Sequence, residues 1–200
     1  MVSGSSPGVV RISAGNGART ATCGRRSRLE VNKTVMVWLC MTTREVIAST
    51  STEHPNAAWV KQQVDLFVDQ TAGREEPPSI VMHDRDTKFT KEFVAALNDQ
   101  NVRTNALPVA SPNLNGRVER FIQTIKHECL NKFILFGKRH LDHIVDEFVE
   151  YYNTVRSHSE RDNLPPIREM PNETETFNRD ELTVKSYVGG LVKSYERKAA

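Results

Sequence analysis

The sequence predicts an α/β domain built on a mixed sheet with flanking helices. Two observations carry this prediction. Short apolar segments rich in β-branched residues alternate with segments whose apolar residues recur at helical spacing, and a tight turn joins the first two apolar segments. A hairpin followed by alternating helices and strands gives a mixed sheet, and 200 residues are enough to bury the core of such a domain.

The first half of the core begins with two predicted strands, residues 35–41 and 45–50, joined as a hairpin. Asn56 is a plausible N-cap for the next helix, whose apolar stripe comprises Trp59, Val60, Val64, Phe67 and Val68. Residues 79–83 then form a short apolar strand. A helix with Phe93, Val94 and Leu97 on one stripe follows it.

The second half begins with a predicted strand at residues 102–109 and a turn-rich loop at 111–116. Apolar residues at helical spacing predict a long helix over about 117–136 and an amphipathic helix over about 141–155. Three segments follow from these elements: a disordered or non-native N-terminal segment at 1–30, a core at 31–166, and a polar C-terminal extension at 167–200.

Charge and composition exclude several classes of protein. No apolar run is long enough to span a membrane, and the N-terminal residues lack the apolar region of a signal peptide, which favours a cytoplasmic location. Cys23, Cys40 and Cys129 are widely spaced, so neither a disulfide framework nor a zinc site is indicated. The net charge of +2 is too small to argue for nucleic acid, but residues 117–139 are locally basic.

Two acidic residues lie where α/β folds place their sites. Asp84 follows the apolar strand at 79–83, and Glu119 lies near the start of the long helix. Two-metal phosphoryl transfer requires carboxylates that converge on Mg²⁺ or Mn²⁺, and both ions prefer oxygen ligands. A strand-end acid that faces a helix-start acid could supply such ligands, although three carboxylates hold two ions more securely than two.

Glu119, Gln123 and Lys126 lie at positions i, i+4 and i+7, so they share one face of the long helix. The carboxylate could bind metal while the amide and the ammonium group contact DNA. The alternative is an ordinary solvated surface on which Glu119 pairs with Arg120 or Gln123. The helix by itself leaves both interpretations open.

Residues from about 35 to 166 resemble the integrase core domain of bacterial insertion-sequence transposases and retroviral integrases. The motifs that carry this resemblance are Asp84-Arg85-Asp86-Thr87-Lys88-Phe89, Pro112-Asn113-Leu114-Asn115-Gly116-Arg117-Val118-Glu119-Arg120, and Tyr152-Asn153…Arg156-Ser157-His158. The third motif is similar to the family's Tyr-Asn-x-x-Arg-Pro-His element, with Ser157 in place of proline.

The resemblance implies an RNase H-like fold and DNA integration with Mg²⁺ or Mn²⁺, with DNA and either further copies of the chain or a partner transposase chain as partners. Asp84 and Glu119 match the second and third acids of the family, and Asp86 is interpreted as a turn residue. The expected DNA contacts are Asn115, Gly116, Arg117, Arg120, Gln123 and Lys126.

The chain departs from this family at its front. The first catalytic Asp of the family should fall near residues 16–28, yet that window contains no carboxylate, and Glu30 lies too close to the hairpin to replace it. The first strand is therefore expected to be missing or replaced, which would leave the hairpin edge without a partner. The alternatives are an impaired recombinase, an inactive remnant that binds DNA or a partner chain, and an interaction module in which Asp84 and Glu119 do not converge.

Overall fold

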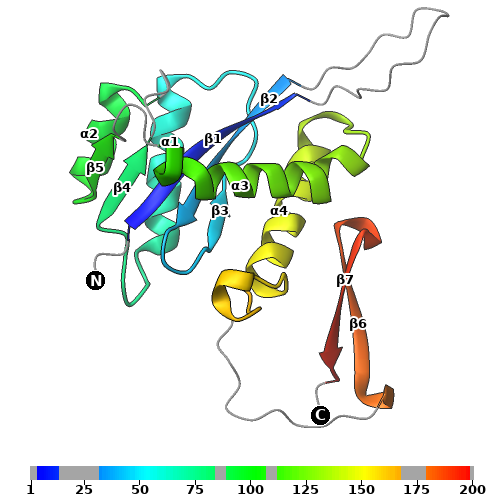
Figure 1. The fold of residues 1–200 in the computed structure, drawn as a ribbon. Helices are drawn as coiled ribbons and strands as arrows, with labels where there is room; N and C mark the ends of the chain where they lie inside the picture. The colour runs from blue at the N-terminus through cyan, green and yellow to red at the C-terminus, as the bar shows by residue number, and fades with distance from the viewer. Residues whose placement is uncertain (1–3, 14–31, 84–88, 107–111, 168–178, 199–200) are drawn as a thin grey trace, which may run out of the picture.

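The computed structural model describes residues 4–13, 32–83, 89–106, 112–167 and 179–198. Five strands form one sheet in the order β3-β2-β1-β4-β5 (Figure 1). Their bounds are β1 Gly4–Ser13, β2 Asn32–Cys40, β3 Val46–Ala48, β4 Ile80–His83 and β5 Arg103–Ala106. Strand β2 is antiparallel to both β1 and β3, whereas β4 is parallel to both β1 and β5. The predicted mixed sheet is confirmed.

The central strand corrects the prediction for the N-terminus. Residues 1–30 were expected to be a disordered or non-native segment, but Gly4–Ser13 forms β1, with Ser5 opposite Cys40 and Ser13 opposite Asn32. Of the two expectations for the first strand, missing or replaced, the structure agrees with a replaced strand, and only the predicted unpartnered hairpin edge is wrong. Gly, Ser and Pro give this segment little strand propensity of its own, and neighbouring strands on both sides supply its ladder hydrogen bonds. Strand β1 contains no Asp or Glu.

Four helices cover the two faces of the sheet (Figure 1). Helices α1 Ala57–Thr71 and α2 Lys91–Asp99 lie on one face, and α3 Pro112–Glu128 and α4 Gly137–Thr154 lie on the other. Strand β2 contributes to both cores because successive side chains point to opposite faces. Met36 and Trp38 pack towards α1 and α2, whereas Val35, Val37 and Leu39 pack towards α3 and α4.

Most helix predictions hold, with changes at the ends. The side chain of Asn56 caps α1 by accepting a hydrogen bond of 2.9 Å from the backbone N–H of Trp59. The long helix begins earlier than predicted, at Pro112, so part of the expected loop is helical, and it ends at Glu128 instead of near residue 136. Four short 3₁₀ turns also occur, at Leu130–Lys132, Ser159–Arg161, Arg179–Glu181 and Val188–Gly190.

The C-terminal extension contains a hairpin that the sequence analysis missed. Strands β6 Leu182–Tyr187 and β7 Val192–Arg197 pair antiparallel, and Tyr187 and Val188 are buried in the same core as α3 and α4. Gly189 and Gly190 adopt left-handed backbone angles in the turn between the strands. The extension is thus packed onto the domain through α4.

Cys40 and Cys129 are free thiols, and burial raises the pKa of Cys129 to about 12, with Glu147 adding to the effect. Such a thiol is not ionised at neutral pH and is therefore a poor nucleophile. Cys23 lies outside the described residues. Among the helices that are described, none is long and apolar enough to cross a membrane.

Candidate functional site

The strand that leads to the first predicted acid ends at His83, at the carboxyl end of β4. Asp84 and Asp86 lie outside the described residues. His83 is 7% exposed, and its ring lies 5.1 Å from that of Phe89 and 5.5 Å from that of Phe93. His83 is therefore packed against two aromatic rings. Because β4 neighbours β1, its end lies near the centre of the sheet.

The second predicted acid lies on α3, which packs against β1 and β2. Val118 and Ile125 are buried beneath the helix, whereas Glu119 and Gln123 are exposed and Lys126 is half-buried. The predicted division of α3 into an apolar and a polar face is confirmed. Within this helix, Arg117 and Arg120 are also exposed, Gly116 has open space beside its Cα, and Asn115 lies near the helix start.

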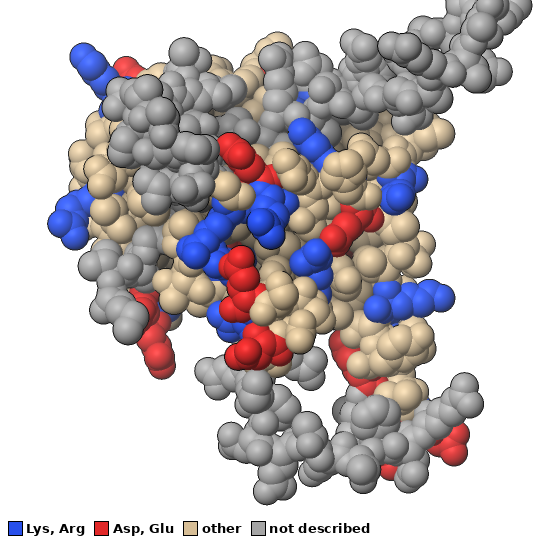
Figure 2. All heavy atoms as spheres, in the orientation of Figure 1, with Lys and Arg blue, Asp and Glu red and all other residues tan. Residues whose placement is uncertain are grey.

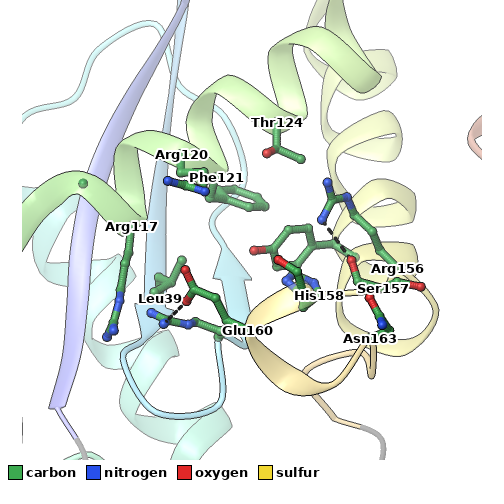
Figure 3. A pocket seen from close by; sticks show the side chains of 14 residues that line it. Leu39, Arg117, Arg120, Phe121, Thr124, Arg156, Ser157, His158, Glu160 and Asn163 are labelled. Carbon is green, nitrogen blue, oxygen red and sulfur yellow. Dashed lines mark hydrogen bonds and ion pairs between the residues drawn. The ribbon is translucent and has the colours of Figure 1, made fainter.

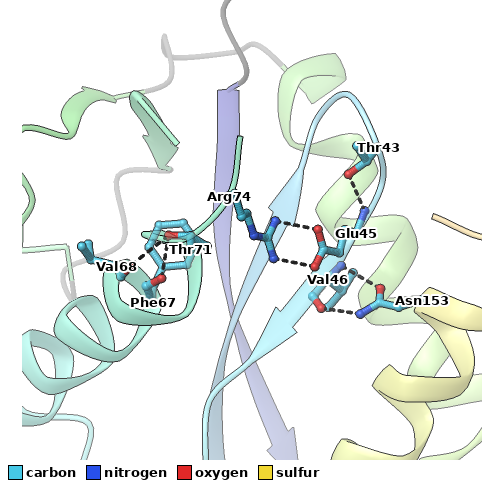
Figure 4. Close-up of polar contacts among 8 residues, drawn as sticks. All are labelled: Thr43, Glu45, Val46, Phe67, Val68, Thr71, Arg74 and Asn153. Atoms are coloured by element: carbon cyan, nitrogen blue, oxygen red, sulfur yellow. Dashed lines mark hydrogen bonds and ion pairs between the residues drawn. The ribbon is translucent and has the colours of Figure 1, made fainter. Parts of the chain in front are cut away.

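Asn153 fixes α4 to the edge of the sheet. Its side-chain amide donates to the carbonyl oxygen of Val46 at 2.8 Å and accepts from the Val46 N–H at 2.9 Å (Figure 4). The amide therefore pairs with β3 as a neighbouring strand would. Glu45, which directly precedes β3, is also held in place: its carboxylate accepts two hydrogen bonds of 2.6 Å from the guanidinium of Arg74, which follows α1. Sequence reasoning saw Asn153 only as part of a family motif.

Two more residues of that motif fix α3 to α4. The ring of Phe121 on α3 meets the edge of Tyr152 on α4 at 4.8 Å between centroids. Arg156 forms two hydrogen bonds, of 2.8 and 2.7 Å, with the carboxylate of Glu128 at the end of α3. Bidentate guanidinium–carboxylate pairs fix orientation as well as distance. The motif therefore sets the position of the helix that carries Glu119.

A pocket of about 540 Å³ opens between α3, the turn that joins β2 to β3, and the segment after α4 (Figure 3). Arg117 and Arg120 line it from α3, Arg44 lines it from the turn, and Arg156 and Glu160 line it from the segment after α4. Arg44 has a left-handed backbone (φ 69°), and its guanidinium forms an ion pair with Glu160. Sequence reasoning missed Arg44 and Glu160, because they are far apart in the chain and belong to no shared motif.

Polar atoms in this pocket are incompletely satisfied. Among the described residues, Nη1 of Arg44 and Nε2 of His158 are buried without a hydrogen-bond partner. The pKa of His158 is lowered from the usual histidine value, mainly by burial, while a hydrogen bond with the Tyr152 backbone opposes this effect. Arg156, Arg161 and Arg44 lower this pKa further by charge repulsion.

The surface around α3 carries both signs of charge. Seen from the side of α3 and α4, basic groups lie interleaved with acidic groups and do not form one continuous basic patch (Figure 2). Within the described ranges, no group of three His, Cys, Asp or Glu side chains is close enough to hold a metal ion.

Comparison with known proteins agrees with this architecture. Residues 100–166 match the integrase core domain family. The "Insertion element IS476 uncharacterized 39.2 kDa protein" of Xanthomonas euvesicatoria is 24% identical over 103 residues, which cover 51% of this chain and 30% of that protein. The chain thus spans about a third of the length of this curated relative.

Solved structures share the fold at low sequence identity. The HTLV-2 integrase catalytic core domain, solved in complex with magnesium, has a TM-score of 0.58 at 14% identity over 80% of this chain and 91% of its own. A chain of the simian T-cell lymphotropic virus intasome in complex with PP2A regulatory subunit B56 gamma has a TM-score of 0.60 at 13% identity, over 90% of this chain and 61% of its own. Residues 100–166 of the chain thus match the integrase core domain family, and the chain shares the fold of the retroviral integrase catalytic cores.

Proposed function

We propose that the chain is the core of an insertion-element recombinase that joins DNA by phosphoryl transfer, and that this activity is impaired. The observation that carries the proposal is α3, which lies within the segment matched by the integrase core family and presents exposed Glu119 beside a polar, partly basic face. Asp84 and Glu119 are the proposed catalytic acids. Asp84 follows β4, and α3 lies against β1, the strand next to β4.

The number of carboxylates at the proposed site of this chain does not meet the metal requirement of the proposed chemistry. Phosphoryl transfer of this kind uses two divalent ions about 3.5–4 Å apart, held by carboxylates. Asp84 and Glu119 are the proposed ligands for Mg²⁺ or Mn²⁺, but β1, the central strand beside β4, has no carboxylate to add. The residues present therefore do not fit a complete two-ion centre. This mismatch is the physical reason to expect impaired catalysis.

The proposed DNA contacts lie on α3. Gln123, Lys126, Arg117 and Arg120 present hydrogen-bond donors along its exposed side, and Asn115 and Gly116 precede them in the same helix. Lysine and arginine contacts to phosphates would give sequence-independent affinity that weakens with salt. Assembly with further copies or with a partner transposase chain is part of the same proposal, because a core that lacks one acid needs another source for it.

The second candidate is a remnant without catalysis that still binds DNA or a partner chain. The observation that favours it is β1, which completes the sheet but carries no acid. The two candidates share the DNA-binding face and differ only in chemistry. A direct assay of strand nicking and joining tests this difference, because residual metal-dependent activity would belong only to the first candidate.

The experiment compares the purified chain with an Asp84→Asn variant, using duplex DNA and either Mg²⁺ or Mn²⁺. We expect salt-sensitive DNA binding by both proteins and little or no nicking or strand transfer by either, because an incompletely held ion activates the attacking oxygen poorly. Metal-dependent cleavage that Asp84→Asn abolishes would support Asp84 and overturn the impairment, which would point to Glu30 or another acid as the substitute. Absence of salt-sensitive DNA binding would contradict the first candidate and the DNA-binding form of the second.

A further inference from the structure

The pocket beside α3 has an excess of positive charge. Among its described lining residues are four arginines and one carboxylate, Glu160. Glu160 forms an ion pair with Arg44. Arg156 forms an ion pair with Glu128, which is not one of the residues that line the pocket. In the described part of the chain, no carboxylate forms an ion pair with Arg117 or Arg120, and the guanidinium of Arg117 donates to the neutral carbonyl of Met41 at 3.0 Å. Within the described residues, the guanidinium groups of Arg117 and Arg120 thus have no carboxylate paired with them.

Glu160 lines the pocket and supplies a carboxylate that pairs with one of its arginines, Arg44. Figure 3 shows its side chain reaching from the segment after α4 towards α3, where Arg117 and Arg120 lie. The Glu160 side chain is 60% exposed, whereas that of its partner Arg44 is only 13% exposed. A guanidinium presents the same pair of N–H donors to a carboxylate and to a phosphate. A phosphate could therefore take the place of the Glu160 carboxylate without moving Arg44.

The unsatisfied atoms indicate the same kind of ligand. Nη1 of Arg44 is a buried donor without a partner, and leaving such a donor unpaired is costly. Nε2 of His158, also in the lining, is a second buried polar atom without a partner among the described residues, and it can donate to an anion once the ring is protonated. An anion with several oxygen acceptors could satisfy the Arg44 donor and Arg120 together, and its negative charge would favour protonation of His158.

We propose that this pocket binds a phosphodiester group of DNA held on α3, and that Glu160 occupies the phosphate position when DNA is absent. The inference rests on the proposed DNA-binding function and extends it beyond α3 to Arg44, His158 and Glu160. Arg117 and Arg120 line the pocket from α3, the helix that also carries the proposed DNA contacts Gln123 and Lys126, so one strand held on α3 can extend into the pocket. Glu160 thereby lowers DNA affinity by competing for Arg44.

The test uses substitutions that change one charge and leave the fold intact. Glu160→Gln removes the competing carboxylate from an exposed position. Glu150→Gln is its matched control, because Glu150 is also exposed and pairs with a cation, Lys185, outside the pocket. Arg44→Asn removes the cation, and asparagine is chosen because it tolerates the left-handed backbone found there. Lys61→Asn removes an exposed charge from α1, on the opposite face of the sheet.

Two measurements are made on each variant: affinity for a duplex by fluorescence anisotropy, and titration with inorganic phosphate followed at the His158 ring by NMR. Glu160→Gln should bind DNA roughly twofold to fivefold more tightly than Glu150→Gln, the factor that corresponds to the free energy of an exposed ion pair. Phosphate should shift the His158 signal at lower concentration in Glu160→Gln and should fail to shift it in Arg44→Asn, while Lys61→Asn behaves like the unmodified chain.

Each outcome bears on the proposal in a different way. Equal DNA affinities and equal phosphate midpoints for Glu160→Gln and Glu150→Gln would overturn the pocket assignment and leave DNA binding on α3 untouched. Phosphate binding at His158 in a chain that does not bind DNA would overturn the DNA assignment together with the proposed function. A phosphate response that persists in Arg44→Asn would also overturn the proposal, because Arg44 is its central donor.

Discussion

Asn153 acts as one rung of a β-ladder although it belongs to a helix. Its amide satisfies both the N–H and the carbonyl of Val46 on edge strand β3, where the sheet has no further strand. Asn153 is 7% exposed, so water cannot readily replace those two bonds. A single side chain thus closes the edge of the sheet and fixes the end of α4.

Replacing Asn153 by Ala should destabilise the protein. Both Val46 groups would lose their partners, and each buried unpaired group costs about 1–3 kcal/mol. Urea denaturation of Asn153→Ala beside Asn98→Ala measures the difference, because Asn98 is exposed on α2 and should change stability by less than about 0.5 kcal/mol. Equal denaturation midpoints for the two variants would show that the amide contributes nothing specific.

At the scale of elements, α3 packs into the core on one side and presents the proposed catalytic and DNA-binding residues on the other. Val118, Phe121 and Ile125 anchor it in the core, and the Glu128–Arg156 pair holds its end against the segment after α4. These contacts fix the position of α3 relative to the sheet. Carboxylates and cations on its exposed face can then act only at defined positions.

Lys126→Ala should weaken DNA binding and reduce the salt dependence of that binding. A lysine that contacts one phosphate contributes about one unit to the slope of log affinity against log salt concentration. Binding isotherms at several salt concentrations give the slope, and Lys61→Ala on α1 is the matched control because it removes one exposed lysine from the far side of the sheet. If the two substitutions have the same effect, the α3 face is only solvated surface.

At the scale of the whole molecule, the sheet brings together segments that are distant in the chain. Strand β1 lies between β2 and β4, and α3 packs against β1, in front of it in the view of Figure 1. In this arrangement the end of β4 and the exposed side of α3 belong to one region of the domain. The arrangement supports the convergence of Asp84 and Glu119, which stays a prediction.

The carboxylates of Asp84 and Glu119 should lie within about 10 Å of one another, the reach of an ion or ion pair. Titration of the chain with Mn²⁺, followed by electron paramagnetic resonance, should show weaker binding in Asp84→Asn and in Glu119→Gln. Asp86→Asn is the matched control and should bind Mn²⁺ like the unmodified chain. An experimental structure with the two carboxylates farther apart than this, or Mn²⁺ binding that depends on Asp86 alone, would refute the site.

Much of this molecule follows from local sequence. The stripe of α1 with its Asn56 cap, the apolar run of β2 and the two-sided pattern of α3 were predictable, because periodicity and capping depend on near neighbours. The motifs around Asp84 and Glu119 likewise identified the integrase core resemblance from residues alone. These features depend only on residues close to one another in the chain, so they can be predicted without the tertiary structure.

Only the tertiary structure decided the rest. Gly4–Ser13 has weak strand propensity and becomes β1 because β2 and β4 offer ladder partners on both sides. Tyr187 and Val188 enter the core from a polar segment because α4 leaves an apolar surface there to cover. Arg44 and Glu160 meet across 116 positions of chain, a pairing without any local pattern. Long-range contacts of this kind depend on how whole helices and strands pack together. Local sequence patterns, which involve only residues close in the chain, do not determine that packing.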